Sequence, residues 1–372
     1  MNPERPVLII LHGGAGSGPA EQAVARVRAA AARAAVHHAL EGGFEAVIVA
    51  TDNPSSFPPA PGLILDPDPP ALPFDFHARV AELVARFGLT RSAVMGGGAL
   101  PLATAGDFAA LAREVSGAER VVVTNNFFSS DLTAWTPGEA FLGLTNISRD
   151  NVLPRRLRDQ AGLRPITLPR GTRLHFDLDT PCDLAVLALQ EDLAPALAAA
   201  VGETPLPLAP YRRVMRILCD PAAELVVTGR VGSAAWSYLE TETACRVRML
   251  SEERGLAAAG PTHRARSVLG FLLEAVGIAG FFERVCALGD AIVIDTRVIE
   301  AHLGLEPSRE DRFQSDLLNP AAITDPFLRE FTAAAAGAAK PVLLGGHSLV
   351  SGGLMALTDA AWLENDRVVS SQ

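Results

Sequence analysis

Lysine is almost absent from this chain of 372 residues. Lys340 is the only lysine, so arginine carries nearly all of the positive charge. Schiff-base and other amine chemistry requires a lysine side chain, so the scarcity of lysine excludes that chemistry almost everywhere in the protein. Acidic residues outnumber basic ones and give a formal net charge of −10, which argues against general binding to nucleic acid or to an anionic membrane.

Cysteine pairs and long apolar runs are also lacking. The four cysteines, at positions 182, 219, 245 and 286, are widely spaced and form no pair of the metal-binding type. No run approaches the roughly 18 apolar residues of a membrane-spanning helix. The first residues lead only into a short apolar run, unlike a secretory leader. We therefore expect a protein of the reducing cytoplasm that does not enter a membrane.

Apolar residues make up 49% of the chain, and the length suggests two domains or one large one. The first half alternates short apolar runs with helical segments. Strands are expected at residues 7–11, 46–50, 92–95 and 121–124, helices at 20–40, 76–87 and 104–115, and a proline-rich loop at 54–73. This alternation predicts an α/β fold with a mostly parallel sheet and helices on both of its faces.

A proline-rich segment at residues 204–210 interrupts the chain. Because proline cannot continue a helix, we place a boundary there, between a first domain at residues 1–203 and a second at residues 211–372. In the second domain, strands are expected at 224–228, 291–295 and 341–344, and a helix at 266–276. The second domain is therefore expected to be α/β or α+β.

Two acids follow residues 172–176, which we expect to be extended. In a strand, residues i and i+2 point to the same side, so Asp177 and Asp179 could present two carboxylates to a hard cation such as Mg²⁺. Thr180 is typical of a helix N-cap and Pro181 of the first helical residue, with Asp183 as the acid three residues on. The sequence thus predicts a metal-binding corner followed by a helix.

The stretch Asp-Leu-Asp-Thr-Pro-Cys-Asp-Leu, at residues 177–184, resembles a signature of GT-A-type nucleotidyltransferases. This superfamily includes the molybdenum-cofactor and 2-phospholactate guanylyltransferases. The resemblance covers roughly residues 6–195 and implies a GT-A-like, Rossmann-related first domain. It also implies that Asp177 and Asp179 are catalytic and hold the Mg²⁺ that bridges the nucleotide phosphates. The second half of the chain resembles no family.

A glycine-rich loop lies between the first expected strand and the first expected helix. Backbone N–H groups of such a loop can bind a phosphate, so Gly13, Gly14, Gly16 and Ser17 are candidate nucleotide contacts. The position matches the first nucleotide-binding loop of the GT-A nucleotidyltransferases. The basic residue that usually follows those glycines is absent, because the chain continues Pro-Ala-Glu-Gln.

A second departure concerns the stretch at residues 93–104, which resembles the central Gly-x-Asp-x-Pro-Leu-Leu-Thr segment of the family. That segment normally supplies a metal-binding aspartate, whereas this chain has Gly98 or Ala99 at the position. Two interpretations stay open. The metal site is rebuilt with another acid, such as Asp52 or Asp131, or activity has been lost.

Two further clusters are candidate ligand contacts. Asn125, Asn126 and Asp131 follow an expected strand, where polar groups suit ligand binding in an α/β sheet but also suit a turn held by side-chain bonds. Arg155 and Arg156 belong to an arginine-rich stretch that could neutralise phosphate charge or form a solvated helix face.

We expect a Mg²⁺-dependent enzyme that transfers a nucleotidyl group from a nucleoside triphosphate to a small molecule bearing a phosphate or carboxylate. Alternatives are a catalytically inactive protein that binds a nucleotide or sugar phosphate, and a glycosyltransferase that uses a nucleotide sugar. A third is chemistry in the second domain around Asp295 and His347. A homodimer is compatible with the Ala/Leu-rich helices, which serve a core equally well.

Overall fold

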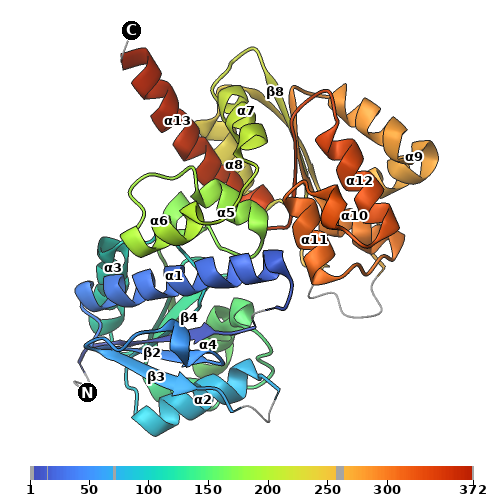
Figure 1. Ribbon diagram of the computed structural model, residues 1–372. Coiled ribbons are helices and arrows are strands. Elements are labelled where there is room, and N and C mark those ends of the chain that lie inside the picture. Colours follow the sequence, from blue (N-terminus) through green and yellow to red (C-terminus); the bar gives the residue numbers. More distant parts are fainter. Residues whose placement is uncertain (1–3, 15, 70–72, 257–263, 371–372) are drawn as a thin grey trace. The chain divides into compact units, whose positions relative to one another are not determined.

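The computed structural model describes residues 4–14, 16–69, 73–256 and 264–370 (Figure 1). By its internal contacts the chain forms two compact units. One comprises residues 1–15 and 25–177, and the other comprises residues 16–24 and 178–372. This division falls earlier in the sequence than the proline-rich segment at 204–210, which leads into a helix of the second unit, α7 (Leu208–Leu218).

The first unit is built on a seven-stranded sheet of order β3-β2-β1-β4-β6-β5-β7. The strands are β1 (Val7–His12), β2 (Ala46–Thr51), β3 (Leu63–Pro67), β4 (Ser92–Gly96), β5 (Val121–Thr124), β6 (Leu132–Thr136) and β7 (Arg164–Thr167). Only β6 runs antiparallel to its neighbours β4 and β5. The expected α/β fold with a mostly parallel sheet is therefore confirmed.

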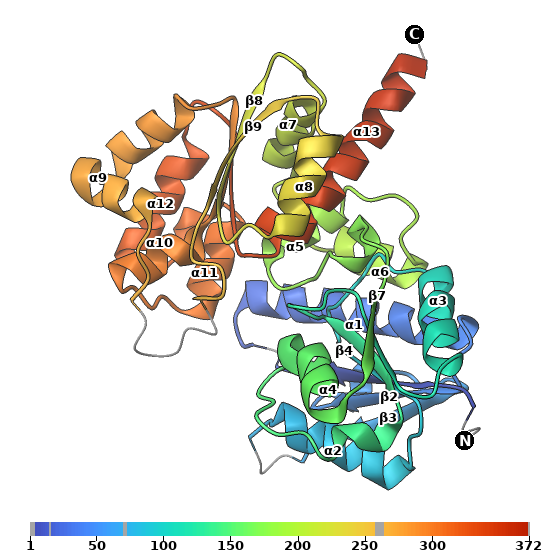
Figure 2. The same cartoon turned by 180° about the vertical axis from the view of Figure 1, so that it is seen from behind.

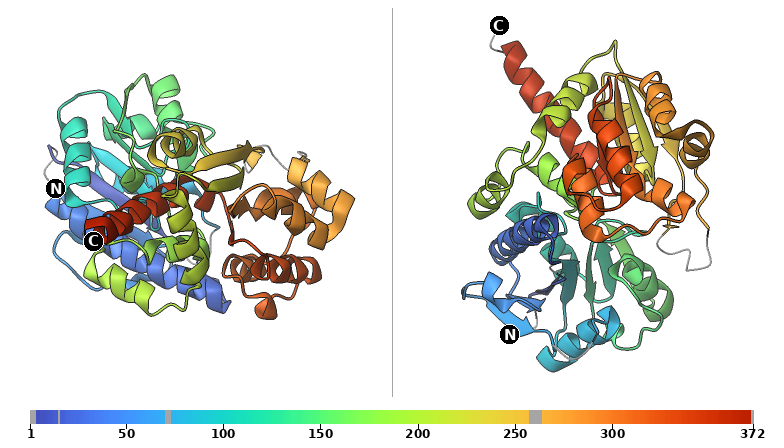
Figure 3. Two further views of the ribbon diagram at one scale, coloured as in Figure 1. Left: turned by 90° about the horizontal axis from the view of Figure 1, so that it is seen from above. Right: turned by 45° about the vertical axis from the view of Figure 1, so that its right-hand side comes forward.

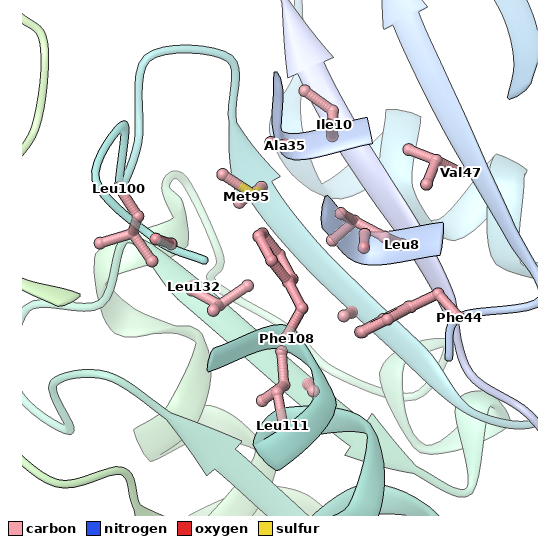
Figure 4. Close-up of a cluster of buried hydrophobic side chains, with 14 of the residues drawn as sticks. Leu8, Ile10, Ala35, Phe44, Val47, Met95, Leu100, Phe108, Leu111 and Leu132 are labelled. Atoms are coloured by element: carbon pink, nitrogen blue, oxygen red, sulfur yellow. The ribbon is translucent and has the colours of Figure 1, made fainter. Parts of the chain in front are cut away.

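Both faces of this sheet are buried, as the continuous apolar runs predict. The helices are α1 (Pro19–Glu41), α2 (Phe76–Phe87), α3 (Ala105–Ser116) and α4 (Leu153–Ala161). Leu8 and Ile10 of β1 pack on one face with α1 and α3, where Phe108 is fully buried (Figure 4). Val7 and Ile9 point to the other face, which α2 and α4 cover.

The second unit contains a parallel four-stranded sheet of order β11-β10-β8-β9 (Figure 2). Its strands are β8 (Glu224–Gly229), β9 (Arg246–Ser251), β10 (Ala291–Asp295) and β11 (Val342–Gly345). The helices are α5 (Pro181–Leu187), α6 (Pro195–Gly202), α7, α8 (Ser233–Glu242), α9 (Val268–Cys286), α10 (Thr296–Leu303), α11 (Arg309–Asp316), α12 (Pro326–Ala336) and α13 (Leu354–Ser370). Helices flank both faces of the sheet (Figure 3), so the second unit is α/β.

Two expectations about local structure are wrong. Residues 172–176 do not form a strand, because a 3₁₀ turn occupies Thr172–Leu174 and the N–H of His175 donates to the carbonyl of Thr172. Only Asp177 is paired, in an isolated antiparallel bridge with Ala99. The expected proline-rich loop at 54–73 also contains the edge strand β3, whose terminal proline needs no partner for an N–H group.

None of the helices in the described part of the chain has the length and apolar character that crossing a membrane requires.

Candidate functional site

The candidate site is the carboxyl edge of β1, β2 and β4 in the first unit. These strands are parallel and adjacent, so the residues that follow them lie at one edge of the sheet. His12 ends β1, Asp52 follows β2, and Gly97 follows β4. Edges of this kind bind ligands in open α/β sheets because several loops converge there.

His12 is the buried centre of this edge, with 9% of its surface exposed. Its ring packs edge-on against Phe57, with 5.1 Å between the ring centroids. Its Nδ1 nitrogen faces Gly97, where an added Cβ atom would lie only 2.3 Å away. Burial, together with the nearby charge of Arg28, lowers the pKa of His12 to about 4. The imidazole is therefore neutral at pH 7.

Two arginines of α1 place positive charge beside His12. The charges of Arg28 and Arg33 both lower the pKa of the imidazole, and the carboxylate of Asp52 acts in the opposite sense. Arg33 donates to the carbonyl of Ser56 over 2.8 Å. Arg28 is half-buried, and its enclosed Nε has no hydrogen-bond partner among the described residues. A half-buried guanidinium without a carboxylate partner suits an anionic ligand.

The structure gives less support for phosphate binding by the glycine-rich loop than the sequence suggests. Ala15 lies outside the described residues. The N–H of Gly14 donates to Oδ2 of Asp52 over 3.0 Å, which links the ends of β1 and β2. Gly16 is half-buried and Ser17 is exposed. Phosphate contacts of this loop stay a prediction.

The N-terminus of α1 is already bound to a carboxylate. The N–H groups of Ala20 and Glu21 each donate to Glu310 of α11 over 3.1 Å. The N–H of Gly18 donates to the side chain of Glu21 over 2.9 Å. The first N–H groups of this helix therefore have anionic partners from the protein itself, and a nucleotide phosphate would compete with Glu310 for them.

Asp177 lies beside the segment from which the family aspartate is missing. Its bridge to Ala99 brings together the two stretches that carry the sequence resemblance. Asp177 is half-buried and Asp179 is exposed. In the part of the chain that the structure describes, no group of three or more His, Cys, Asp or Glu side chains is arranged to hold a metal ion. The Mg²⁺ site stays a prediction.

The rest of the signature has a structural role. The Asp183 carboxylate closes a capping box at the start of α5 and accepts from the N–H of Thr180 over 2.8 Å. Oδ2 of Asp183 also accepts from the hydroxyl of Ser348 over 2.7 Å. The expected cap is confirmed. Burial, together with the charge of Asp179, raises the pKa of Asp183 from 3.8 to about 7.

The polar cluster after β5 holds a turn together. Asn125 donates to Oδ2 of Asp131 over 3.0 Å and to the carbonyl of Leu174 over 2.9 Å, and its Oδ1 accepts from the N–H of Asp131. Oδ1 of Asn126 accepts from the N–H of Phe128. These bonds use both amide donors of Asn125 and favour the turn interpretation, while ligand contact stays a prediction.

Arg155 and Arg156 lie on α4, the first exposed and the second half-buried. Neither forms an ion pair among the residues described here, in contrast to Arg158, which pairs with Asp159. The guanidinium of Arg158 also lies 4.8 Å from the ring centre of Phe127. This contact joins the arginine-rich helix to the turn after β5, two sequence motifs that could not be connected beforehand.

The candidate residues of the second unit also meet at a sheet edge. Arg230 follows β8 and donates to Asp295 at the end of β10 through Nε and Nη2, over 2.6 and 3.0 Å. Gly229 allows this approach, because a Cβ atom there would lie 2.3 Å from Cβ of Asp295. His347 is exposed in the turn after β11. Chemistry at this edge stays an alternative.

Sequence reasoning missed His12 and Arg28. His12 is a histidine at the end of an apolar run, and Arg28 is one of several arginines in a helix. Neither belongs to a recognisable sequence motif. One signal was present. Polar residues that directly follow a buried strand of an α/β sheet lie at its ligand-binding edge, and His12 meets that description.

Comparison with solved structures finds likenesses over about half of the chain. A nucleotide-diphospho-sugar transferase, so described, from Desulfovibrio desulfuricans is 12% identical with a TM-score of 0.41, and the match covers 53% of this chain and 94% of that one. A cytidylyltransferase from Leptospira borgpetersenii is 13% identical with a TM-score of 0.36, over 50% and 85% of the two chains. A CMP:2-keto-3-deoxy-manno-octonic acid synthetase in complex with CTP is 13% identical with a TM-score of 0.35, over 49% and 96%.

No protein-family model matches the sequence, and no curated protein matches it significantly.

We predict that Asp183→Asn flattens part of the pH dependence of stability. The folded protein holds the Asp183 proton more tightly than the unfolded chain does. Its contribution to the free energy of unfolding is therefore complete below pH 3.8 and is lost as the pH rises to about 7. One such group changes the slope by up to ~1.4 kcal/mol per pH unit. Urea unfolding at pH 4 to 8 measures the slope.

The control for this experiment is Asp311→Asn. Burial opposes the shift, but hydrogen bonds from Thr324 help to lower the pKa of Asp311, so loss of this carboxylate should leave the decline between pH 4 and 7 in place. Identical pH profiles for the wild type and Asp183→Asn would show that the Asp183 carboxyl is not held in a proton-binding environment.

Proposed function

We propose that the first unit binds a nucleoside triphosphate at the carboxyl edge of β1, β2 and β4 and transfers its nucleotidyl group to a small acceptor. The acceptor would carry a phosphate or carboxylate, and pyrophosphate would leave. The observation that carries the proposal is the half-buried Arg28, whose charge acts on the neutral His12 and whose enclosed Nε has no hydrogen-bond partner among the described residues.

The charges at this edge favour an anion. Arg28 and Arg33 together outweigh the one nearby carboxylate, Asp52, in a chain whose net charge is −10. Local positive charge attracts anionic ligands to the edge. Arg28, whose charge acts on His12 just before the glycine loop, is proposed to replace the basic residue that is absent after the glycines.

The proposed cation is Mg²⁺, held by Asp177 and Asp179. Mg²⁺ commonly binds through one or two protein carboxylates together with substrate phosphates and water, so two acids without a third ligand are a suitable donor set. When bound, the cation would supply charge neutralisation for the nucleotide phosphates. Arg155 and Arg156 of α4, which have no ion pair in the described structure, are proposed to neutralise charge that develops during transfer.

A protein that binds a nucleotide or sugar phosphate without catalysis is the second candidate. It is favoured by Gly98 and Ala99 at the position of the family aspartate and by Glu310 at the N-terminus of α1. Such a protein would bind a nucleotide with Mg²⁺ but release no pyrophosphate with any acceptor. Transfer from a nucleotide sugar would instead release a nucleoside mono- or diphosphate.

We predict that Arg28→Met weakens nucleoside triphosphate binding by about tenfold or more, because a hydrogen bond to a charged group contributes roughly 1.5 to 3 kcal/mol. Isothermal titration calorimetry measures the dissociation constant. The matched control is Arg26→Met, two residues away on the same helix and exposed, which should leave the dissociation constant within about twofold. Equal affinities of Arg28→Met and the wild type would remove the proposed anion site.

We predict that the double substitution Asp177→Asn and Asp179→Asn abolishes the Mg²⁺-dependent part of nucleotide binding, together with turnover. A ligand that binds only the folded state raises the melting temperature, so thermal shifts with and without Mg²⁺ measure this part directly. Asp159→Asn, an exposed acid on α4, serves as the control. Unchanged turnover and an unchanged Mg²⁺-dependent shift in the double variant would overturn the assignment of the metal site.

A further inference from the structure

Neither ring nitrogen of His12 has a hydrogen-bond partner among the described residues. Nδ1 is fully enclosed without a partner, and no partner of Nε2 is found in the part of the chain that the structure describes. Buried polar side chains are almost always hydrogen-bonded, and an exception indicates an ordered water or a ligand that completes the site. Of the two nitrogens only Nδ1 is fully enclosed, so Nε2 is the hydrogen-bonding position left open at the edge where the nucleotide is proposed to bind.

The packing of the ring indicates which nitrogen carries the proton. An added Cβ atom on Gly97 would lie 2.3 Å from Nδ1, so a Cα hydrogen of Gly97 lies on the side of that nitrogen. A proton on Nδ1 would meet this hydrogen, whereas a lone pair on Nδ1 faces it favourably. The neutral ring therefore carries its proton on Nε2 and can act there only as a donor.

The charges that act on the imidazole come mainly from groups that can only donate. Arg28 and Arg33, whose charges act on the ring, can only donate, and Asp52, whose carboxylate acts in the opposite sense, accepts from the N–H of Gly14 over 3.0 Å. An amino group of a ligand placed at Nε2 would meet the N–H of the ring, which cannot accept a hydrogen bond from it. A carbonyl oxygen would accept from Nε2 in a region of positive charge.

We propose that His12 is a specificity-determining residue that donates from Nε2 to a carbonyl oxygen of the nucleobase. The inference rests on the proposed function and narrows its substrate class. The preferred nucleotides carry a ring carbonyl, as guanine, hypoxanthine, cytosine and uracil do, and adenine is disfavoured because it has no ring carbonyl.

The test compares two nucleotides that differ at this position. Inosine and adenosine triphosphates differ in the substituent at position 6 of the purine, a carbonyl in the first and an amino group in the second. Calorimetric titration of the full-length protein in Mg²⁺ buffer should show inosine triphosphate binding about tenfold more tightly. In His12→Phe, which keeps an aromatic ring but has no donor, the ratio should fall to about one, mainly through weaker binding of inosine triphosphate.

Two further variants distinguish loss of the base preference from misfolding and from a general loss of binding. His12→Gln retains a side-chain donor and should recover part of the preference. The matched control His77→Phe changes a histidine of α2 that packs against Phe141, with 5.4 Å between ring centroids, and should keep the wild-type ratio. Melting temperatures of all variants show whether each one folds.

The possible results distinguish failure of the base assignment from failure of the proposed function. If neither nucleotide binds to the wild-type protein, the proposed function fails. If both bind equally well to the wild type, or if His12→Phe weakens both by the same factor, nucleotide binding stands but the base assignment is overturned, because His12 would then contact a part common to both ligands. A preference for inosine triphosphate that survives in His12→Phe also overturns the base assignment.

Discussion

The close packing of His12 against Gly97 is the constraint on which the edge of the first sheet depends. Any side chain at position 97 would collide with the imidazole, since even a Cβ atom would lie 2.3 Å from Nδ1. This packing buries the ring, and burial together with the neighbouring arginines keeps it neutral. The position of one glycine thus sets the protonation state and orientation of the polar group at the centre of the site.

The regular elements could be predicted from the sequence wherever one physical pattern dominated. Strands β1 and β2 are continuous apolar runs because both faces of the sheet are buried, and α2 begins and ends at the predicted residues. Strand β6 was not predicted. Its residues, Leu-Thr-Ala-Trp-Thr, are all buried, but a short segment of mixed polarity gives no periodic signal.

The signature at residues 177–184 predicts the local structure correctly for some of its residues and wrongly for the segment before it. Asp183 and Thr180 form the expected capping box, because local sequence rules govern helix starts. The extended run expected before Asp177 is a 3₁₀ turn instead, since a local hydrogen bond to Thr172 replaces strand pairing. Arg28 and His12 could not be found in this way, because their importance comes from missing partners, which only a three-dimensional structure reveals.

Hydrogen exchange of the full-length protein, with and without a nucleoside triphosphate and Mg²⁺, tests the central claim most directly. A bound ligand protects the backbone that it contacts or orders. The account predicts protection in peptides that cover residues 11–14, 51–53 and 96–99, at the edge of β1, β2 and β4. Protection confined to residues 229–232 and 345–348, after β8 and β11, would contradict it and place the ligand in the second unit.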